Sequence, residues 1–462
     1  MQTVLFIDRA AVETATGVHF ALNPPQKHPL NPILLPGNPF EWDSLQVSWP
    51  ATVLYDASEG RFRCWYAGLD AVQTPGRFWQ TGYAESDDGL HWVKPDLGQA
   101  TYLDRPTNRV VLPWAPSAML RCVFENPDRT DPGQRFGCLY LETARRSDGA
   151  SYLRSGLGWS ADGKAWTPGG VAYEAPGNDR PAYQDIFQVL LDADDPDPGF
   201  RVKGYAQTYG TRAYDGRPNV RHIGLAHGPS INWLADAHDP VLLSPLEGID
   251  EELHGGSVYR VGSTYLMLVE SGTYSCTPLH GDLRLAVSAD GRRFRRVHPD
   301  TPFVATGPRG SWDENLLICT ASAMQEVGEE VFIYYLGCPN VYNCWPVEYA
   351  AIPERRGSLL YPSYMGVATV ARDRFGCVQG HGEVVTRPVQ IGPSGLWLNA
   401  EGRGIVVEAL GGAGEVLARG KLGRRARQTV YRNVVWSGEP PSGAVRLRLK
   451  LDGSTRLYSM RH

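Results

Sequence analysis

Short runs of alternating apolar and polar residues dominate the chain, and helical periodicity is almost absent. The runs are rich in β-branched and aromatic residues and end at Gly, Asp or Pro, as in ATVLYD, RFRCWYAG, GCLYLET and EVFIYYLG. A period of two between such turn residues is typical of β-strands. The pattern therefore predicts an all-β protein.

One phrase recurs along the chain, with the form Ser-x-Asp-Gly-x-x-aromatic. It occurs as YAESDDGLHW, LGWSADGKAW and LAVSADGRRF, and IGLAHGPSINW and MGVATVARDRFG are degenerate copies. Asp-Gly between two strands favours a tight hairpin in which both residues adopt positive φ. Successive copies are on average about 71 residues apart, and a period of this size in an all-β chain indicates radially repeated sheets. We therefore predict a five-bladed β-propeller.

Each predicted blade begins with a strand, at residues 47–56, 117–126, 183–192, 254–270 and 315–324. Side chains just ahead of these strands are expected to line the mouth of the central funnel. After about residue 385 the phrase is lost, and five or more further strands follow. We predict a propeller over residues 1–388 and a C-terminal β-sandwich over 389–462, with the N-terminal segment packing on the sandwich or closing the ring.

Composition and charge narrow the function. The 462 residues carry a net charge of −5 with no block of like charges, so neither nucleic acid nor a membrane is an expected partner. No apolar run is long enough for a membrane span, and no signal peptide is visible, which favours a cytoplasmic protein. The cysteines form no CxxC pair, so structural zinc is not expected. We expect no cofactor and name no metal ligands, and an ion on the propeller axis is left open. The 13 Trp and 22 Tyr residues favour a sugar-binding protein, and a homo-oligomer is left open.

Several segments resemble a known enzyme superfamily. They are LFIDRAAVETATG, TVLYDASEGRFRCWYAG, YAESDDGLHWVKPDLG, VFENPDRTDPGQRFGCLY and GPRGSWDENLL. Together they resemble a bacterial branch of the five-bladed β-propeller glycoside hydrolases, the fructofuranosidase and arabinofuranosidase superfamily of families 32 and 43. The resemblance implies hydrolysis of a furanoside or related glycan. Ser48-Trp49-Pro50 stands where fructofuranosidases carry an Asn-Asp-Pro-Asn phrase, so the usual nucleophile phrase is missing.

Glycoside hydrolysis usually needs two carboxyl groups, one protonated and one ionised, across the scissile bond. Candidates stand just ahead of, or at the start of, the predicted first strands. The catalytic candidates are Asp43, Asp185, Glu252, which follows Glu251, and Asp313. Glu270 is expected to be a core or rim residue. Turn positions are predicted for Asp56, Asp88, Asp162 and Asp290.

Aromatic and polar side chains near the strand starts are candidates for contacting a sugar ring, with core packing as the alternative. The substrate-binding candidates are Trp42, Trp49, Tyr183, His254, Trp312, Glu314, Tyr342 and Trp345. The long segment 338–364 is predicted to form a rim loop over the pocket.

Other functions remain open at this point. Inverting hydrolysis is favoured over retaining hydrolysis because the nucleophile phrase is missing. A glycoside phosphorylase would place phosphate where water attacks, with Arg221 and His222 as its only hint. A sialidase-like enzyme would explain the Asp-Gly turns but needs six repeats and three arginines. A non-catalytic glycan-binding propeller is the alternative from another functional class.

Overall fold

The computed structural model describes residues 1–70, 79–145, 147, 149, 151–174, 185–209, 221–232, 234–242, 251–273, 280–339, 362–402, 404–424 and 429–462. Within these residues the regular structure is β-strand, apart from the short 3₁₀ turns η1 (Arg9–Ala11), η2 (Pro132–Gln134) and η3 (Pro198–Phe200). None of these helical turns has the length or apolar character needed to cross a membrane. The predicted all-β class is confirmed.

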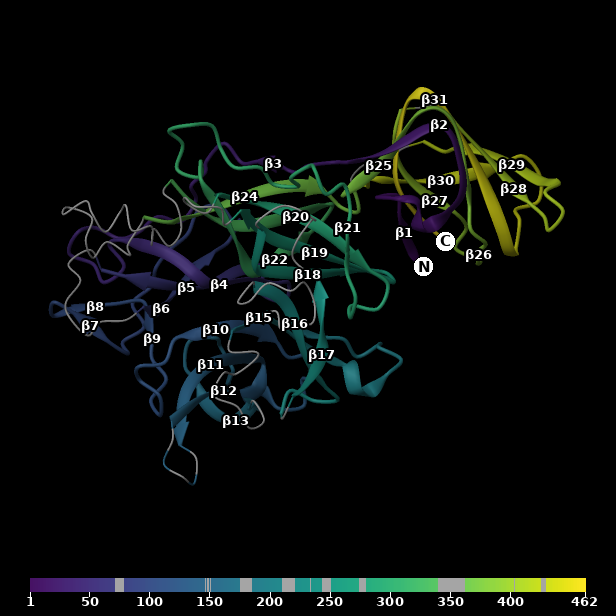
Figure 1. Ribbon diagram of the computed structural model, residues 1–462. Helices are drawn as coiled ribbons and strands as arrows, with labels where there is room; N and C mark the ends of the chain where they lie inside the picture. The colour runs from purple at the N-terminus through teal and green to yellow at the C-terminus, as the bar shows by residue number, and fades with distance from the viewer. Residues whose placement is uncertain are drawn as a thin grey trace.

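Five antiparallel units of four strands each make up the larger part of the molecule (Figure 1). Unit 1 contains β4 (Gln46–Asp56), β5 (Arg61–Leu69), β6 (Gln80–Ser86) and β9 (Arg109–Val110). Unit 2 contains β10 (Leu120–Glu125), β11 (Phe136–Arg145), β12 (Ser151–Ser160) and β13 (Thr167–Tyr173). Unit 3 contains β14 (Asp185–Leu191), β15 (Val202–Tyr209), β16 (Arg221–Gly228) and β17 (Ala235–Leu242). Unit 4 contains β18 (Glu251–Val261), β19 (Thr264–Thr273), β20 (His280–Ser288) and β21 (Arg295–Arg296). Unit 5 contains β22 (Leu316–Val327), β23 (Glu330–Cys338), β24 (Tyr364–Ala371) and β3 (Gln26–Lys27).

Apolar seams hold neighbouring units together. Separate clusters of buried side chains join units 1 and 2, units 2 and 3, units 3 and 4, units 4 and 5, and units 5 and 1. Single parallel bridges also link the sheets, Gly281 with Leu316 between units 4 and 5 and Thr52 with Ala321 between units 1 and 5. The five units therefore close into a ring with a propeller-like arrangement.

The recurring phrase forms the turn that ends the third strand of a unit. In unit 1 the Ser86 hydroxyl accepts from the Gly89 amide (2.9 Å), and Asp88 Oδ1 accepts from the amides of Leu90 and His91 (both 2.8 Å). The Asp162 and Asp290 turns repeat this pattern, so their predicted turn role is confirmed. The prediction that both central residues have positive φ is wrong, because the glycine alone does so. The Ser and Asp side chains satisfy the turn amides, so the aspartate keeps an ordinary φ.

Each of these turns docks on the neighbouring unit. The glycine carbonyl accepts a hydrogen bond from an aromatic side chain on the second strand of the preceding unit, counting around the ring. The pairs are Tyr334 with Gly89 (3.1 Å), Trp65 with Gly163 (2.7 Å) and Tyr205 with Gly291 (2.9 Å). The first of them joins unit 5 to unit 1 and so helps to close the ring.

The C-terminal strands form one closed sheet, which differs from the predicted sandwich. The closed path runs β31 (Gly443–Arg461), β27 (Trp397–Glu401), β30 (Tyr431–Trp436), β29 (Val416–Leu422), β28 (Ile405–Leu410) and back to β31. Closure is possible because the two halves of the long β31 have different partners: residues 446–451 pair with β28 and residues 456–461 pair with β27. A strand of 19 residues thus serves as two strands of a small barrel.

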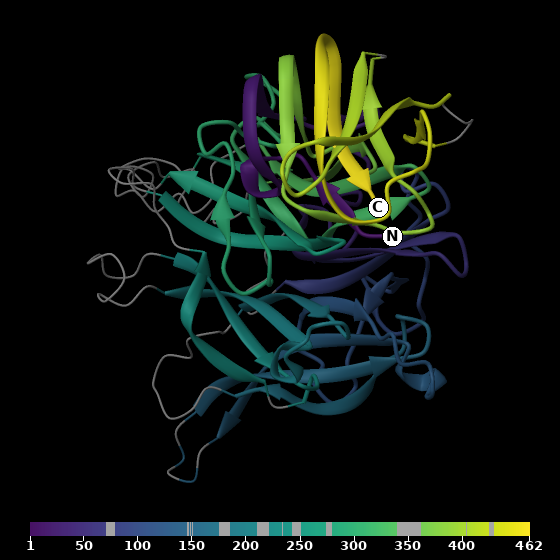
Figure 2. The same cartoon turned by 90° about the vertical axis from the view of Figure 1, so that its right-hand side faces the viewer.

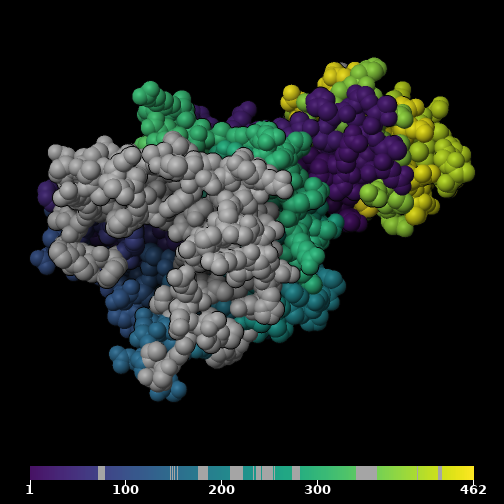
Figure 3. Space-filling model, viewed as in Figure 1, coloured from purple at the N-terminus to yellow at the C-terminus, as the bar shows by residue number. Residues whose placement is uncertain are grey.

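The N-terminal segment packs on this C-terminal sheet. Strand β1 (Thr3–Leu5) pairs with β31, as does β26 (Val389–Ile391), and β2 (Val12–Leu22) pairs with β25 (Gly376–Thr386), which itself pairs with β31 (Figure 2). The space-filling view shows the N-terminal residues directly against the C-terminal ones (Figure 3). The chain leaves this sheet, builds the ring and returns through β25.

Candidate functional site

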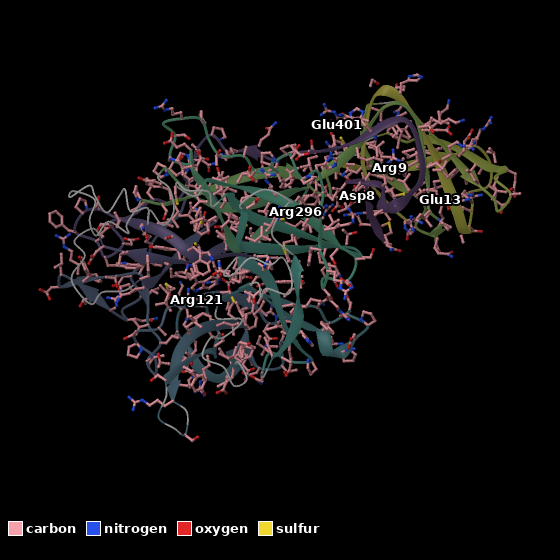
Figure 4. All side chains as sticks on the ribbon, viewed as in Figure 1. Asp8, Arg9, Glu13, Arg121, Arg296 and Glu401 are labelled. Atoms are coloured by element: carbon pink, nitrogen blue, oxygen red, sulfur yellow. The ribbon has the colours of Figure 1, made fainter. Side chains whose placement is uncertain are left out.

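The first strands of the five units start at one face of the ring, which we call the mouth. Trp49 of β4 lies near the ring axis, because its half-buried ring packs against two separate clusters, the one between units 1 and 5 and the one between units 3 and 4. The guanidinium of Arg121, on β10 of unit 2, lies 5.4 Å from the centroid of the Trp49 ring. Figure 4 shows Arg121 where β10 faces β4. Trp49 therefore reaches from unit 1 across the axis to the cluster between units 3 and 4, and Arg121 of the neighbouring unit 2 lies beside it.

Every first strand contains an irregularity. The pairing of first and second strands shifts register between Ser48 and Ala51 in unit 1 and within the first five residues of the first strands of units 2 to 4; in unit 5 it shifts farther along, between Cys319 and Met324. A β-bulge bends a strand and redirects its side chains. The repeated bulge supports a mouth at which side chains from all five units turn toward the axis.

A buried ion pair, between Asp43 and Lys94, lies in unit 1 just ahead of β4. Asp43, only 1 % exposed, accepts hydrogen bonds through Oδ2 from the Lys94 ammonium (2.6 Å) and the Tyr66 hydroxyl (2.6 Å). The Asn108 amide donates to that hydroxyl (2.8 Å) and accepts from the Trp42 indole (2.8 Å). Trp42 is stacked with Tyr66, their centroids 6.0 Å apart. We call these five residues the brace of unit 1.

Unit 5 contains the same brace built from distant residues. Asp313, 3 % exposed, accepts through Oδ2 from the Lys27 ammonium (2.5 Å) and the Tyr335 hydroxyl (3.3 Å). The Asn31 amide donates to that hydroxyl (3.3 Å), and Trp312 is stacked with Tyr335 at 5.7 Å. Each lysine also lies over the ring of its tyrosine, at 5.5 Å in unit 1 and 5.4 Å in unit 5. We call this second set the brace of unit 5.

Glycines on the second and third strands make room for each indole. A Cβ on Gly68 or Gly82 would lie 2.5 or 2.7 Å from Trp42, and a Cβ on Gly337 or Gly366 would lie 2.3 or 2.5 Å from Trp312. Both tryptophans therefore lie flat on their own sheet. This packing is the alternative that the sequence left open for them.

The pKa of the tyrosine is shifted in the same direction in the two braces. Burial, followed by the adjacent aspartate, raises the pKa of both Tyr66 and Tyr335 well above the usual value. Both hydroxyls therefore stay protonated and donate to the carboxylate. Each buried aspartate accepts from one lysine and one tyrosine, and each tyrosine accepts from one asparagine amide. The recurrence of the same buried arrangement in two units points to a structural role.

The remaining catalytic candidates are placed by their backbone. Asp185 begins β14 opposite Gln207, and Glu252 lies on β18 opposite Gly272. His254 falls in the bulge of β18 between Leu253 and Gly255. The side chains of these three candidates lie outside the described residues, as do Tyr183, Tyr342, Trp345 and most of the rim loop predicted at 338–364. Glu314 is half-buried on the loop just ahead of β22, where it accepts from the Gly310 amide and from Asn315 Nδ2 (3.2 Å).

Sequence reasoning passed over Glu270, which the structure brings toward the mouth. Its place at the end of the predicted strand 254–270 suggested a position remote from the mouth. The structure has a hairpin there, with β18 ending at Val261 and β19 starting at Thr264, so Glu270 pairs with Gly255 near the start of the first strand. The side chain is 4 % exposed. Burial raises the pKa of the Cys319 thiol and the Glu270 carboxylate raises it further, so this carboxylate faces unit 5. The sequence could have shown this, because a second strand that runs antiparallel to the first ends beside the start of the first strand.

The described side chains do not include a metal centre: no three of His, Cys, Asp and Glu gather among them. The chemistry offered at the mouth by the described residues is therefore that of carboxylates, an arginine and aromatic rings.

Comparison with known proteins identifies solved structures that have a similar fold. No protein-family model matches the chain, and no curated protein matches it. A solved structure titled glycoside hydrolase superposes with a TM-score of 0.51 at 15 % identity, covering 75 % of this chain and 92 % of that chain. A glycosyl hydrolase from Bacteroides ovatus has a TM-score of 0.45 at 14 % identity, covering 77 % and 95 %. A β-1,2-mannobiose phosphorylase from Listeria innocua has a TM-score of 0.45 at 13 % identity, covering 75 % and 96 %. The chain thus shares its fold with a solved glycoside hydrolase.

Proposed function

We propose that this protein is a carbohydrate-active enzyme that cleaves a glycosidic bond at the mouth of its ring. We also propose that the five units are the blades of a five-bladed propeller in the superfamily of families 32 and 43. The observation that carries the proposal is the convergence of five bulged first strands on one mouth, where Trp49 and Arg121 meet on the axis. The fold shared with a glycoside hydrolase supports it.

The acid and the base are proposed to be Asp185 and Glu252. Asp43 and Asp313 were also candidates by position, but their carboxylates are engaged in the two braces. That leaves the first strands of units 3 and 4 to supply the pair. One carboxyl protonates the departing oxygen while the other activates a water on the opposite face of the sugar, which requires about 6.5–9.5 Å between them.

A second candidate is phosphorolysis of the same bond. The observation that favours it is Arg121, a cation brought to the axis beside Trp49. A guanidinium binds phosphate oxygens through two parallel hydrogen bonds. In that case inorganic phosphate takes the place of water, and a sugar phosphate replaces the free reducing sugar as the product.

The test is a turnover screen of the full chain on aryl furanosides, aryl pyranosides and neutral oligosaccharides, in phosphate-free buffer and with added inorganic phosphate. We expect Asp185→Asn and Glu252→Gln to lose about 100-fold or more of the turnover while keeping the wild-type melting temperature. Release of free sugar identifies a hydrolase, and release of sugar phosphate only when phosphate is added identifies a phosphorylase.

The control is Asp43→Asn, which alters the brace of unit 1. We expect it to lower the melting temperature and to leave turnover measurable in the folded protein. A folded but inactive Asp43→Asn together with an active Asp185→Asn would overturn the choice of residues. Saturable glycan binding without turnover of any substrate would support the non-catalytic glycan-binding propeller instead.

A further inference from the structure

The two braces differ in the length of chain between their lysine and their asparagine. In unit 5, three residues separate Lys27 from Asn31, whereas in unit 1 thirteen residues separate Lys94 from Asn108. Unit 1 therefore carries ten additional residues between two equivalent points of the structure. Since unit 5 builds the same brace without them, folding of the unit does not require this insertion.

The insertion contains a small hairpin of strained conformation. Strands β7 (Thr101–Tyr102) and β8 (Arg105–Pro106) pair through a turn in which Leu103 and Asp104 have φ of 49° and 59°. Positive φ is unfavourable for a leucine. Leu103 is also 59 % exposed, so no burial of its side chain offsets this strain. Strain of this kind persists where the surrounding structure holds it and is often found at functional sites.

Hollows lie on both sides of the hairpin and share Trp42 and Tyr102. The inner one, of about 150 Å³, is lined by Asp70 and Gln80, at the ends of strands β5 and β6 that reach the mouth. The outer one, of about 260 Å³, is lined by Phe40, Arg105 and other residues of the loop ahead of β4 and of the insertion. The inner hollow therefore borders the mouth, and the outer one adjoins it at Trp42 and Tyr102.

The outer hollow has the features of a sugar subsite. Phe40 is 63 % exposed at its edge, and the corresponding residue of unit 5 is Gly310. Arg105 lines the hollow, and its guanidinium makes no hydrogen bond or ion pair with any described residue. Aromatic faces and charged donors beside a concave surface are what bind the apolar face and the hydroxyls of a sugar.

The net charge of the residues that line the outer hollow favours a neutral ligand over an anionic one. Its charged lining residues are Glu41, Asp43 and Asp96 against Lys94 and Arg105. The sum is a single negative charge, which disfavours phosphate and uronate groups. Pockets for larger ligands span about 300–1,000 Å³, so this smaller hollow suits a single sugar ring.

We propose that the outer hollow is a distal subsite for one neutral sugar unit of an oligosaccharide whose reacting end lies at the mouth. This inference rests on the proposed function and sharpens it, because it makes the substrate an oligosaccharide and not a simple glycoside. Phe40 stacks on the sugar ring, and Arg105 donates hydrogen bonds to its hydroxyls.

The test compares wild type with Phe40→Ala and Arg105→Ala on arabino-, fructo- and manno-oligosaccharides, from disaccharide to pentasaccharide, and on the aryl glycoside of the same sugar. We expect KM for the longer chains to rise about five- to tenfold in either variant. The aryl glycoside, which does not reach the outer hollow, should keep its KM and kcat. The matched control is Leu30→Ala, an exposed apolar residue in the short segment of unit 5, which should change nothing.

Equal losses on all substrates, or no loss on any, would overturn the distal subsite while leaving the glycosidase proposal intact. If the wild type turns over none of these compounds, calorimetric titration with the same oligosaccharides separates the two proposals. Length-dependent binding that weakens in Phe40→Ala supports the subsite even though the catalytic proposal has failed. Absence of binding by the wild type overturns the subsite as well.

Discussion

Units 1 and 5 contain the same brace but differ in what surrounds it. In both, a tryptophan lies on two glycines while the next residue, an aspartate, binds a tyrosine and a lysine. Unit 1 alone adds the exposed Phe40 and the hairpin insertion, and with them the outer hollow. A buried group that recurs with the same partners serves the fold, whereas an exposed addition to it is where function is expected.

The largest effect is expected from removing the lysine of each brace. Lys94→Ala and Lys27→Ala both leave a buried aspartate without its cation. Breaking a fully buried pair costs about 3–5 kcal/mol, and the loss here should lie toward the lower end because both lysines are partly exposed. Lys94 is less exposed than Lys27 (22 % against 30 %) and also donates to the Leu35 carbonyl (2.8 Å), so its loss should lower the melting temperature more. Calorimetry measures both melting temperatures. A larger fall for Lys27→Ala than for Lys94→Ala would contradict this ranking of the two braces.

An intermediate effect is expected from the glycines beneath the indoles. Gly68→Ala and Gly337→Ala place a methyl group within 2.5 and 2.3 Å of Trp42 and Trp312, and overpacking of this kind costs about 1–3 kcal/mol. Similar losses of urea stability would show that the two braces are packed alike. Gly392→Ala is the control, because nothing lies within 4 Å of its Cβ position. Wild-type stability in either brace variant would contradict the packing argument.

The smallest effect concerns the turn that joins the two units, where Gly89 accepts from Tyr334. Burial raises the pKa of Asp88, but hydrogen bonds from the His91 side chain, the His91 and Leu90 amides and Ser86 lower it below its usual 3.8. A lowered folded-state pKa gives stability that is present above about pH 4 and is lost as the pH falls through the folded value. The melting temperature of Asp88→Asn should therefore fall less steeply than that of wild type below pH 4. Parallel curves for the two proteins would rule out this contribution.

The repeat was visible in the sequence because local chemistry produces it. The five phrases lie at the ends of the third strands, and four of the predicted first strands lie within a few residues of β4, β10, β14 and β22. The strand predicted at 254–270 is wrong at its end, because β18 stops at Val261 and the chain turns back into β19 at Thr264. Alternation and turn residues act over a few positions, so they are legible in a single sequence. The aspartates of the turns could be recognised for the same reason.

The role of the brace aspartates could not be predicted in this way. Asp43 and Asp313 were identified by their places ahead of first strands, yet the lysine of Asp313 lies 286 residues away in the chain. Glu270 shows the opposite case, since pairing with β18 brings it toward the mouth from a position that seemed remote. In both cases the environment of a carboxylate depends on partners that only the closed ring supplies.

The sequence by itself determined the strands, their period and the turn chemistry, because each depends on residues that are neighbours along the chain. Tertiary structure decided which carboxylates are paired, how unit 5 borrows β3 from the N-terminal segment, and how the two halves of β31 close the C-terminal sheet. These features depend on contacts between distant segments. Such contacts form only when burial of the seams between units offsets the entropy lost in bringing those segments together.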